Sequence, residues 1–135
     1  NELRAVFDMR HLARLEVFSV YKNCLSRVPP GLGQLTSLKR LWLGINAFHT
    51  EPPPPPPTSE LSTAAAATES IDEVAELRSL RVLNMRGNDI HSLPEALSRL
   101  TNLDVLSLWR NKLTGPRAIP SRCALARLAS RLAWL

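Results

Sequence analysis

The chain has 135 residues, 44% of them hydrophobic, which is ordinary for one globular domain with a single core. Seventeen basic residues, fourteen of which are arginines, outnumber twelve acidic residues and give a formal charge of +5. Arginine binds carboxylates and phosphates alike, so this charge leaves both acidic proteins and nucleic acids open as partners. No apolar run approaches the roughly 18 to 20 residues that a membrane-spanning helix needs, so we expect no membrane segment.

The two cysteines favour a reducing, cytoplasmic location. Cys24 and Cys123 are ninety-nine positions apart and form no CxxC or Cys/His pattern, so neither a disulfide framework nor a zinc knuckle is indicated. No signal-peptide pattern begins the chain. Because the chain starts at Asn1 without a methionine, secretion and a fragment of a longer protein both stay open as alternatives.

A pattern of leucines with one asparagine recurs along the chain. The clearest copy spans 77–100 and contains Leu77, Leu80, Leu83, Met85, Asn88, Ile90, Leu93, Pro94, Leu97 and Leu100. Asn46 follows Asn23 by twenty-three positions, and Asn111 follows Asn88 by the same spacing. A fixed period of this size indicates a solenoid of stacked repeats.

Four repeats are predicted within one domain at 1–135, namely 12–34, 35–76, 77–99 and 100–122. The second repeat holds nineteen extra residues, because Asn88 follows Asn46 by forty-two positions. We place the insertion at about 53–69, on the return side of the repeat. Leucines at helical spacing predict an amphipathic helix at 122–135, which either caps the stack or belongs to a degenerate fifth repeat.

Alternation within one repeat predicts a short strand followed by a return limb. It sends Leu83 and Met85 to one face and the residues between them to the other. Pro94 suits the first turn of a helix on the way back. One such unit buries too little to fold alone, so neighbouring units must stack.

The full pattern, LxxLxxLxLxxNxLxxLPxxLxxL, resembles the leucine-rich repeat in the form found in Ras-suppressor-type and Scribble-like cytoplasmic proteins. The resemblance implies an α/β solenoid with short parallel strands on the concave side and helical or irregular return limbs on the convex side. It also implies that the repeated asparagines form a structural ladder. In such proteins the concave face commonly binds protein partners.

Candidate binding residues are the strand residues whose identity the repeat leaves free. The outward positions are Val17, Ser19, Tyr21, Lys22, Arg40, Trp42, Gly44, Ile45, Val82, Asn84, Arg86, Gly87, Val105, Ser107, Trp109 and Arg110. Among them we predict partner contacts at Tyr21, Lys22, Arg40, Trp42, Asn84, Arg86, Trp109 and Arg110, because aromatic residues and arginine are enriched at interface hot spots. The alternative is that the tryptophans only shield the sheet and the arginines only add solubility.

No catalytic motif, metal site or cofactor site is predicted. The sequence holds no GxSxG, Gly-rich phosphate loop or HExxH. His49 and His91 each follow a repeated asparagine by three residues, but two imidazoles without a third ligand make a poor metal site. Pro52 to Pro57 favours a polyproline II rod, which is either a spacer or a contact for an SH3, WW, EVH1 or profilin-type domain.

The sequence therefore predicts a non-enzymatic protein-interaction module, with a signalling scaffold as its setting. Two other functions stay open. The segment could be the regulatory repeat region of a larger kinase, GTPase or immune-receptor-like protein, or it could bind nucleic acid through its arginine-rich face. A third alternative is an incomplete gene product without an independent role.

Overall fold

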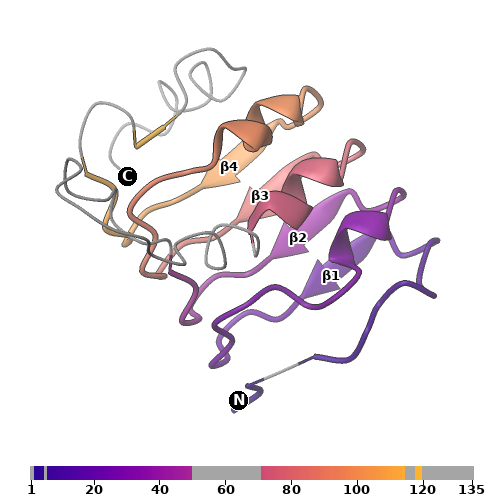
Figure 1. Ribbon diagram of the computed structural model, residues 1–135, viewed down its shortest axis with the longest axis horizontal. Helices are drawn as coiled ribbons and strands as arrows, with labels where there is room; N and C mark the ends of the chain where they lie inside the picture. Colours follow the sequence, from indigo (N-terminus) through magenta and orange to yellow (C-terminus); the bar gives the residue numbers. More distant parts are fainter. Residues whose placement is uncertain (1, 5, 50–70, 115–117, 120–135) are drawn as a thin grey trace, which may run out of the picture.

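Four short strands form one parallel sheet in a computed structural model that describes residues 2–4, 6–49, 71–114 and 118–119. The strands are β1 (Val17–Ser19), β2 (Arg40–Trp42), β3 (Val82–Asn84) and β4 (Val105–Ser107). They lie side by side in chain order, and each pairs with the next in the same register (Figure 1). Equivalent residues of successive units therefore stand in columns across the sheet. This arrangement confirms the predicted α/β solenoid with short parallel strands.

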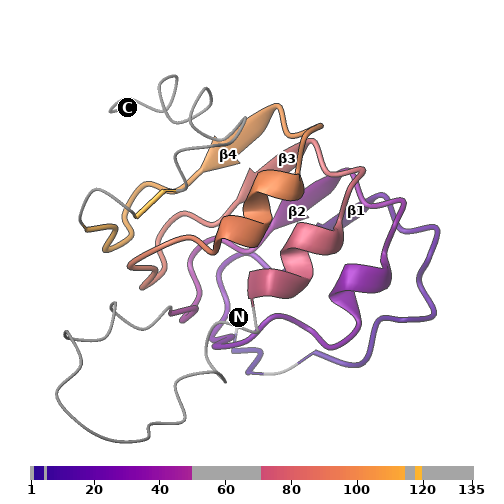
Figure 2. The same ribbon diagram turned by 45° about the horizontal axis from the view of Figure 1, so that its top comes forward.

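The described parts of the return limbs contain short 3-10 helices, and in the second limb the α-helical residues Ile71 and Asp72 come directly before the 3-10 helix. The 3-10 helices are η1 (Leu32–Gln34), η2 (Glu73–Glu76) and η3 (Glu95–Arg99), which lie in a row along one face of the sheet (Figure 2). Each limb ends with the same backbone hydrogen bond, donated at 3.0–3.1 Å by the N–H of Leu35, Leu77 or Leu100 to the carbonyl three residues earlier. The tight i→i+3 bond suits a limb that must turn back within a few residues.

Pro94 stands one position before the place that the sequence predicted. It precedes η3 in an extended conformation, with φ −62° and ψ 143°, whereas the sequence placed it in the first helical turn. Its carbonyl accepts a hydrogen bond from the N–H of Leu97 at 3.1 Å. The fixed φ of proline is compatible with both conformations, so the residue type alone could not decide between them.

The core lies between the sheet and the return limbs, and the predicted alternation is confirmed. Leu83 and Met85 are at most 1% exposed, while Val82, Asn84 and Arg86 on the other face are only partly buried. Across the sheet, the central residue of each strand forms one apolar column, namely Phe18, Leu41, Leu83 and Leu106. Burial of such columns between neighbours is what holds a stack of repeats together.

The sheet is continuous across the long second unit. Arg40 pairs with Val82 in the register that relates Val17 to Arg40 and Val82 to Val105. Val74 of η2 takes the place that Leu32 and Leu97 take in the neighbouring limbs. The predicted insertion at about 53–69, the Pro52 to Pro57 segment and the helix at 122–135 lie outside the described residues. The limits of the four repeats stay a prediction.

Candidate partner-binding face

The repeated asparagines are structural, as predicted, and do not form a site. The side-chain oxygens of Asn23, Asn46, Asn88 and Asn111 accept hydrogen bonds at 3.0–3.2 Å from backbone N–H groups of the preceding unit. Each amide nitrogen donates to backbone carbonyls of the turn after the strand. The amides therefore satisfy backbone groups that the turn leaves unpaired.

The concave face is the face of the sheet opposite the 3-10 helices, and all eight predicted contact residues belong to its columns. The first two columns are Val17, Arg40, Val82 and Val105, and then Ser19, Trp42, Asn84 and Ser107. Beyond the strands follow Tyr21, Gly44, Arg86 and Trp109, and last Lys22, Ile45, Gly87 and Arg110. Backbone hydrogen bonds of 2.7–2.9 Å between successive units continue into these last two columns. The contact role of these residues stays a prediction.

The last column turns the chain away from the sheet. Its four residues all have a left-handed backbone, with φ of 59° at Lys22, 52° at Ile45, 64° at Gly87 and 56° at Arg110. Glycine adopts this conformation without strain and asparagine tolerates it, whereas most other residues are strained there. The same turn is therefore repeated in every unit, even where the sequence offers lysine, isoleucine or arginine.

Four predicted residues come together in an aromatic–arginine cluster, which consists of Tyr21, Arg86, Trp109 and Arg110. The guanidinium carbon of Arg86 lies 5.3 Å from the Tyr21 ring centre and 5.5 Å from the Trp109 ring centre. Its Nη2 also donates a hydrogen bond to the Tyr21 hydroxyl. The guanidinium of Arg110 lies 4.4 Å from the same Trp109 ring. These distances are those of cation–π contacts, so the cluster is held by its own side chains.

Gly44 allows Tyr21 to reach across the second unit to Arg86 in the third. A Cβ at position 44 would lie 2.9 Å from the Asn84 side-chain oxygen and 3.1 Å from the Tyr21 ring. The sequence placed all these residues on one face but did not predict this contact, because the period fixes columns and not the reach of a side chain. Gly44 lies between Tyr21 and Arg86 in one column, and its lack of a side chain was the sequence signal that could have indicated this contact.

The other four predicted residues lie outside the cluster. The side-chain oxygen of Asn84 accepts a hydrogen bond from the backbone N–H of Arg86 at 3.1 Å, so this amide also shapes the chain locally. Trp42 is partly buried on β2, whereas Arg40 and Lys22 are exposed. They extend the face on either side of the cluster.

The charges of the concave face differ from those of its edge. None of the sixteen concave positions is Asp or Glu. At the edge where the strands begin, Lys39 pairs with Glu16 at 2.7 Å and Arg81 pairs with Asp104 at 3.2 Å. Edge charges are thus neutralised between neighbouring units. Within the described part of the chain, the cations of the concave face have no such ion pair.

His49 and His91 both lie near the Asp89 carboxylate, beyond the sheet. His49 forms an isolated bridge with Asp89, and Lys112 Nζ lies 2.6 Å from the Asp89 carboxylate. The hydrogen bond from Lys112 holds the pKa of Asp89 below its ordinary value. Over the described ranges, no group of three or more His, Cys, Asp or Glu side chains is arranged to hold a metal ion.

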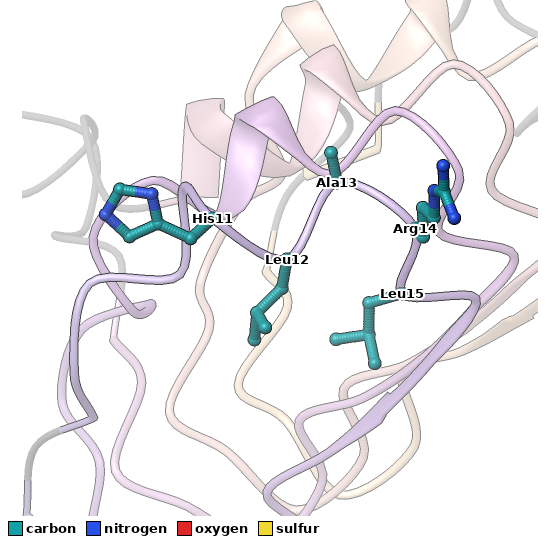
Figure 3. Close-up of a pocket in the computed structure, with 5 residues that line it drawn as sticks. All are labelled: His11, Leu12, Ala13, Arg14 and Leu15. Atoms are coloured by element: carbon teal, nitrogen blue, oxygen red, sulfur yellow. The ribbon is translucent and has the colours of Figure 1, made fainter.

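One open hollow lies away from the concave face. It has a volume of about 470 Å³ and is lined by five consecutive residues, His11 to Leu15 (Figure 3). Leu12 is 49% exposed there, although its counterparts Leu35, Leu77 and Leu100 are buried. The hollow brings no polar side chains from different elements together.

In the part of the chain that the structure describes, no helix is long and apolar enough to span a bilayer.

Comparisons with known proteins find related repeats. Residues 78–118 match the model of a family described as "Leucine Rich repeats (2 copies)". The volume-regulated anion channel subunit LRRC8E of Xenopus tropicalis is 29% identical over 125 residues, which are 93% of this chain and 13% of that protein. The solved structure of the Leptospira interrogans LRR protein LIC12759 has 20% identity and a TM-score of 0.48 to this chain, and the match covers 97% of this chain and 34% of that one.

These matches do not distinguish subfamilies, so the narrower resemblance to Ras-suppressor-type and Scribble-like proteins stays a prediction. The family match agrees with the fixed repeat period, the parallel strands in register and the asparagine ladder. The matched segment and these repeated features together show that the chain contains leucine-rich repeats.

Proposed function

We propose that the chain is a binding module whose concave face holds a segment of a partner protein. One observation carries the proposal: the aromatic–arginine cluster stands on the side of the sheet that faces away from the core. Trp109 in this cluster is 45% exposed. The core requires none of these side chains there, and their types are those enriched among interface hot spots. Leucine-rich repeat domains generally mediate protein–protein interaction and are typically non-enzymatic, which supports this reading.

The mechanism is recognition by a surface that is already ordered. Backbone hydrogen bonds between units fix the columns, and the ring contacts of Arg86 hold the cluster in place. A partner therefore has few side chains of this face to immobilise when it binds. Less ordering at binding leaves more of the contact energy as affinity.

The proposal includes a setting inside a longer protein. The curated relative is a channel subunit, and the chain covers only 13% of its length. We propose that this chain is likewise one region of a larger protein, to which it contributes binding. A cytoplasmic location and a scaffold role in signalling are part of the same proposal, supported by the cysteine pattern and the repeat resemblance.

The test uses peptides selected from a random dodecapeptide library against the wild-type chain. Affinities are then measured for Trp42→Ala/Trp109→Ala and for a control, Arg78→Ala/Arg99→Ala, whose side chains are 60% and 54% exposed away from the concave face. We expect the concave variant to lose about tenfold or more in affinity, a difference of at least about 1.4 kcal/mol, and the control to lose less than about twofold.

Circular dichroism establishes that both variants are folded. Unchanged affinity of a folded Trp42→Ala/Trp109→Ala protein would contradict the proposal. An equal loss in both variants would also contradict it, because the concave face would then have no special role.

A further inference from the structure

The concave face carries positive charge without an acidic counterpart. Its four cations are Lys22, Arg40, Arg86 and Arg110, and no carboxylate occupies any of its sixteen positions. At the adjoining edge, by contrast, both cations have a carboxylate neighbour, through Lys39–Glu16 and Arg81–Asp104. The chain therefore neutralises its edge internally and leaves the face charged.

Arg86 is positioned to receive an anion. Its guanidinium is held between the rings of Tyr21 and Trp109, and one N–H bonds to the Tyr21 hydroxyl. An arginine has five N–H donors in a planar fork, and the other four have no partner among the described residues. Such a fork binds a carboxylate through two parallel hydrogen bonds. Arg110 places a second guanidinium against the same Trp109 ring.

The apolar residues of the face indicate a peptide more than a nucleic acid. Val17 and Val105 are 43% and 49% exposed in the first column, next to the cations. The Trp109 ring, on which a base could stack, is already in contact with two guanidinium groups.

We infer that the partner segment is an extended acidic peptide, in which Asp or Glu carboxylates bind Arg86 and Arg110 and apolar side chains cover the exposed valines. This inference rests on the proposed function and adds the chemistry of the partner. A carboxylate of the peptide would bind the Arg86 guanidinium, whose orientation is already set by the Tyr21 and Trp109 rings.

The experiment takes the peptides selected against the wild-type chain and reads their composition. Each is then resynthesised with Asp and Glu replaced by Asn and Gln, and binding is measured at low and at physiological salt. The protein variants are Arg86→Met, Arg110→Met and Arg86→Lys, with Arg81→Met as the matched control. Arg81 lies on the same unit and its loss changes the net charge equally, but its partner is Asp104 at the edge.

We expect selected peptides to be enriched in Asp and Glu and to lose about tenfold or more in affinity when these are replaced. Arg86→Met and Arg110→Met reduce affinity by a similar factor, Arg86→Lys by a few fold because it keeps the charge without the fork, and Arg81→Met by less than about twofold. Thermal melting of each variant shows that it is folded.

Two results would overturn this inference and leave the proposed function intact. In the first, peptides depend on Trp42 and Trp109 but contain no excess of acids, so the face binds peptides by apolar contact. In the second, a twelve-residue uridine RNA binds more tightly than the acidic peptides and is sensitive to Arg86→Met, so the face binds phosphates. Failure to select any peptide that depends on Trp42 and Trp109 would instead overturn the proposed function itself.

Discussion

At the scale of single residues, the asparagine ladder shows how one side chain can join two units. Asn88 receives a hydrogen bond from Phe48 N–H at 3.2 Å and donates to the Leu43 and Met85 carbonyls at 3.1 and 2.9 Å. It is only 8% exposed, so water cannot replace these bonds if the amide is removed. Asn111 makes the equivalent bonds in the last unit but is only partly buried.

We predict that Asn88→Ala lowers the free energy of unfolding by about 3 kcal/mol, because it leaves buried backbone groups unpaired. Asn111→Ala is the matched control and should lose about half as much, since water reaches its site. Urea denaturation followed by circular dichroism measures both values. Equal losses would show that burial does not set the strength of the ladder.

The repeat period and the family resemblance predicted the ladder and the face but not the contacts within the face. The asparagines were assigned correctly because their role repeats with the period, and every unit offers the same backbone groups. The Tyr21–Arg86 contact joins the first and third units, and it depends on the absent side chain of Gly44. A contact that skips one unit has no periodic signal, so alternation alone could not reveal it.

At the scale of elements, the turn after each strand is more uniform than its sequence. Lys22, Ile45, Gly87 and Arg110 share a left-handed backbone although three of them are not turn-forming residues. The hydrogen bonds between neighbouring turns outweigh the preference of these residues for negative φ. One example is the bond from Ile45 N–H to the Arg86 carbonyl at 2.7 Å. For this reason the sequence predicted the strands from alternation and did not predict these turn conformations.

Substitutions at Gly87 and Ile45, which are neighbours in this column, should change the free energy of unfolding in opposite directions. Gly87→Ala should lower the free energy of unfolding by about 1–2 kcal/mol, because φ is 64° and the new Cβ would lie 3.2 Å from Ile45 Cγ1. Ile45→Asn should raise it by about 1 kcal/mol, because a β-branched residue is strained at φ 52° and asparagine tolerates this region. Chemical denaturation of both variants and the wild type checks the signs. Destabilisation by Ile45→Asn would mean that packing of the isoleucine outweighs its strain.

At the scale of the whole molecule, register is independent of chain length between the strands. Val17, Arg40, Val82 and Val105 are paired neighbours, although the second of the three connections is nineteen residues longer than the other two. A solenoid is held by contacts between adjacent units, so residues that leave and rejoin a return limb need not disturb the stack. A longer connection costs little, since the entropy of loop closure grows only with the logarithm of its length.

Excision of residues 51–69 should therefore leave the fold intact. The deletion joins Thr50 to Ser70 and makes the spacing from Asn46 to Asn88 equal to that from Asn23 to Asn46. We expect a gain in stability of about 0.5 kcal/mol from the shorter connection, seen as a melting temperature that is unchanged or a few degrees higher. A control deletion of nineteen residues at 82–100 removes β3 and η3, and it should abolish the cooperative melt. If excision of 51–69 also abolished that melt, or changed the amide spectra of β1 and β4, the stack would depend on the inserted residues and not on its units alone.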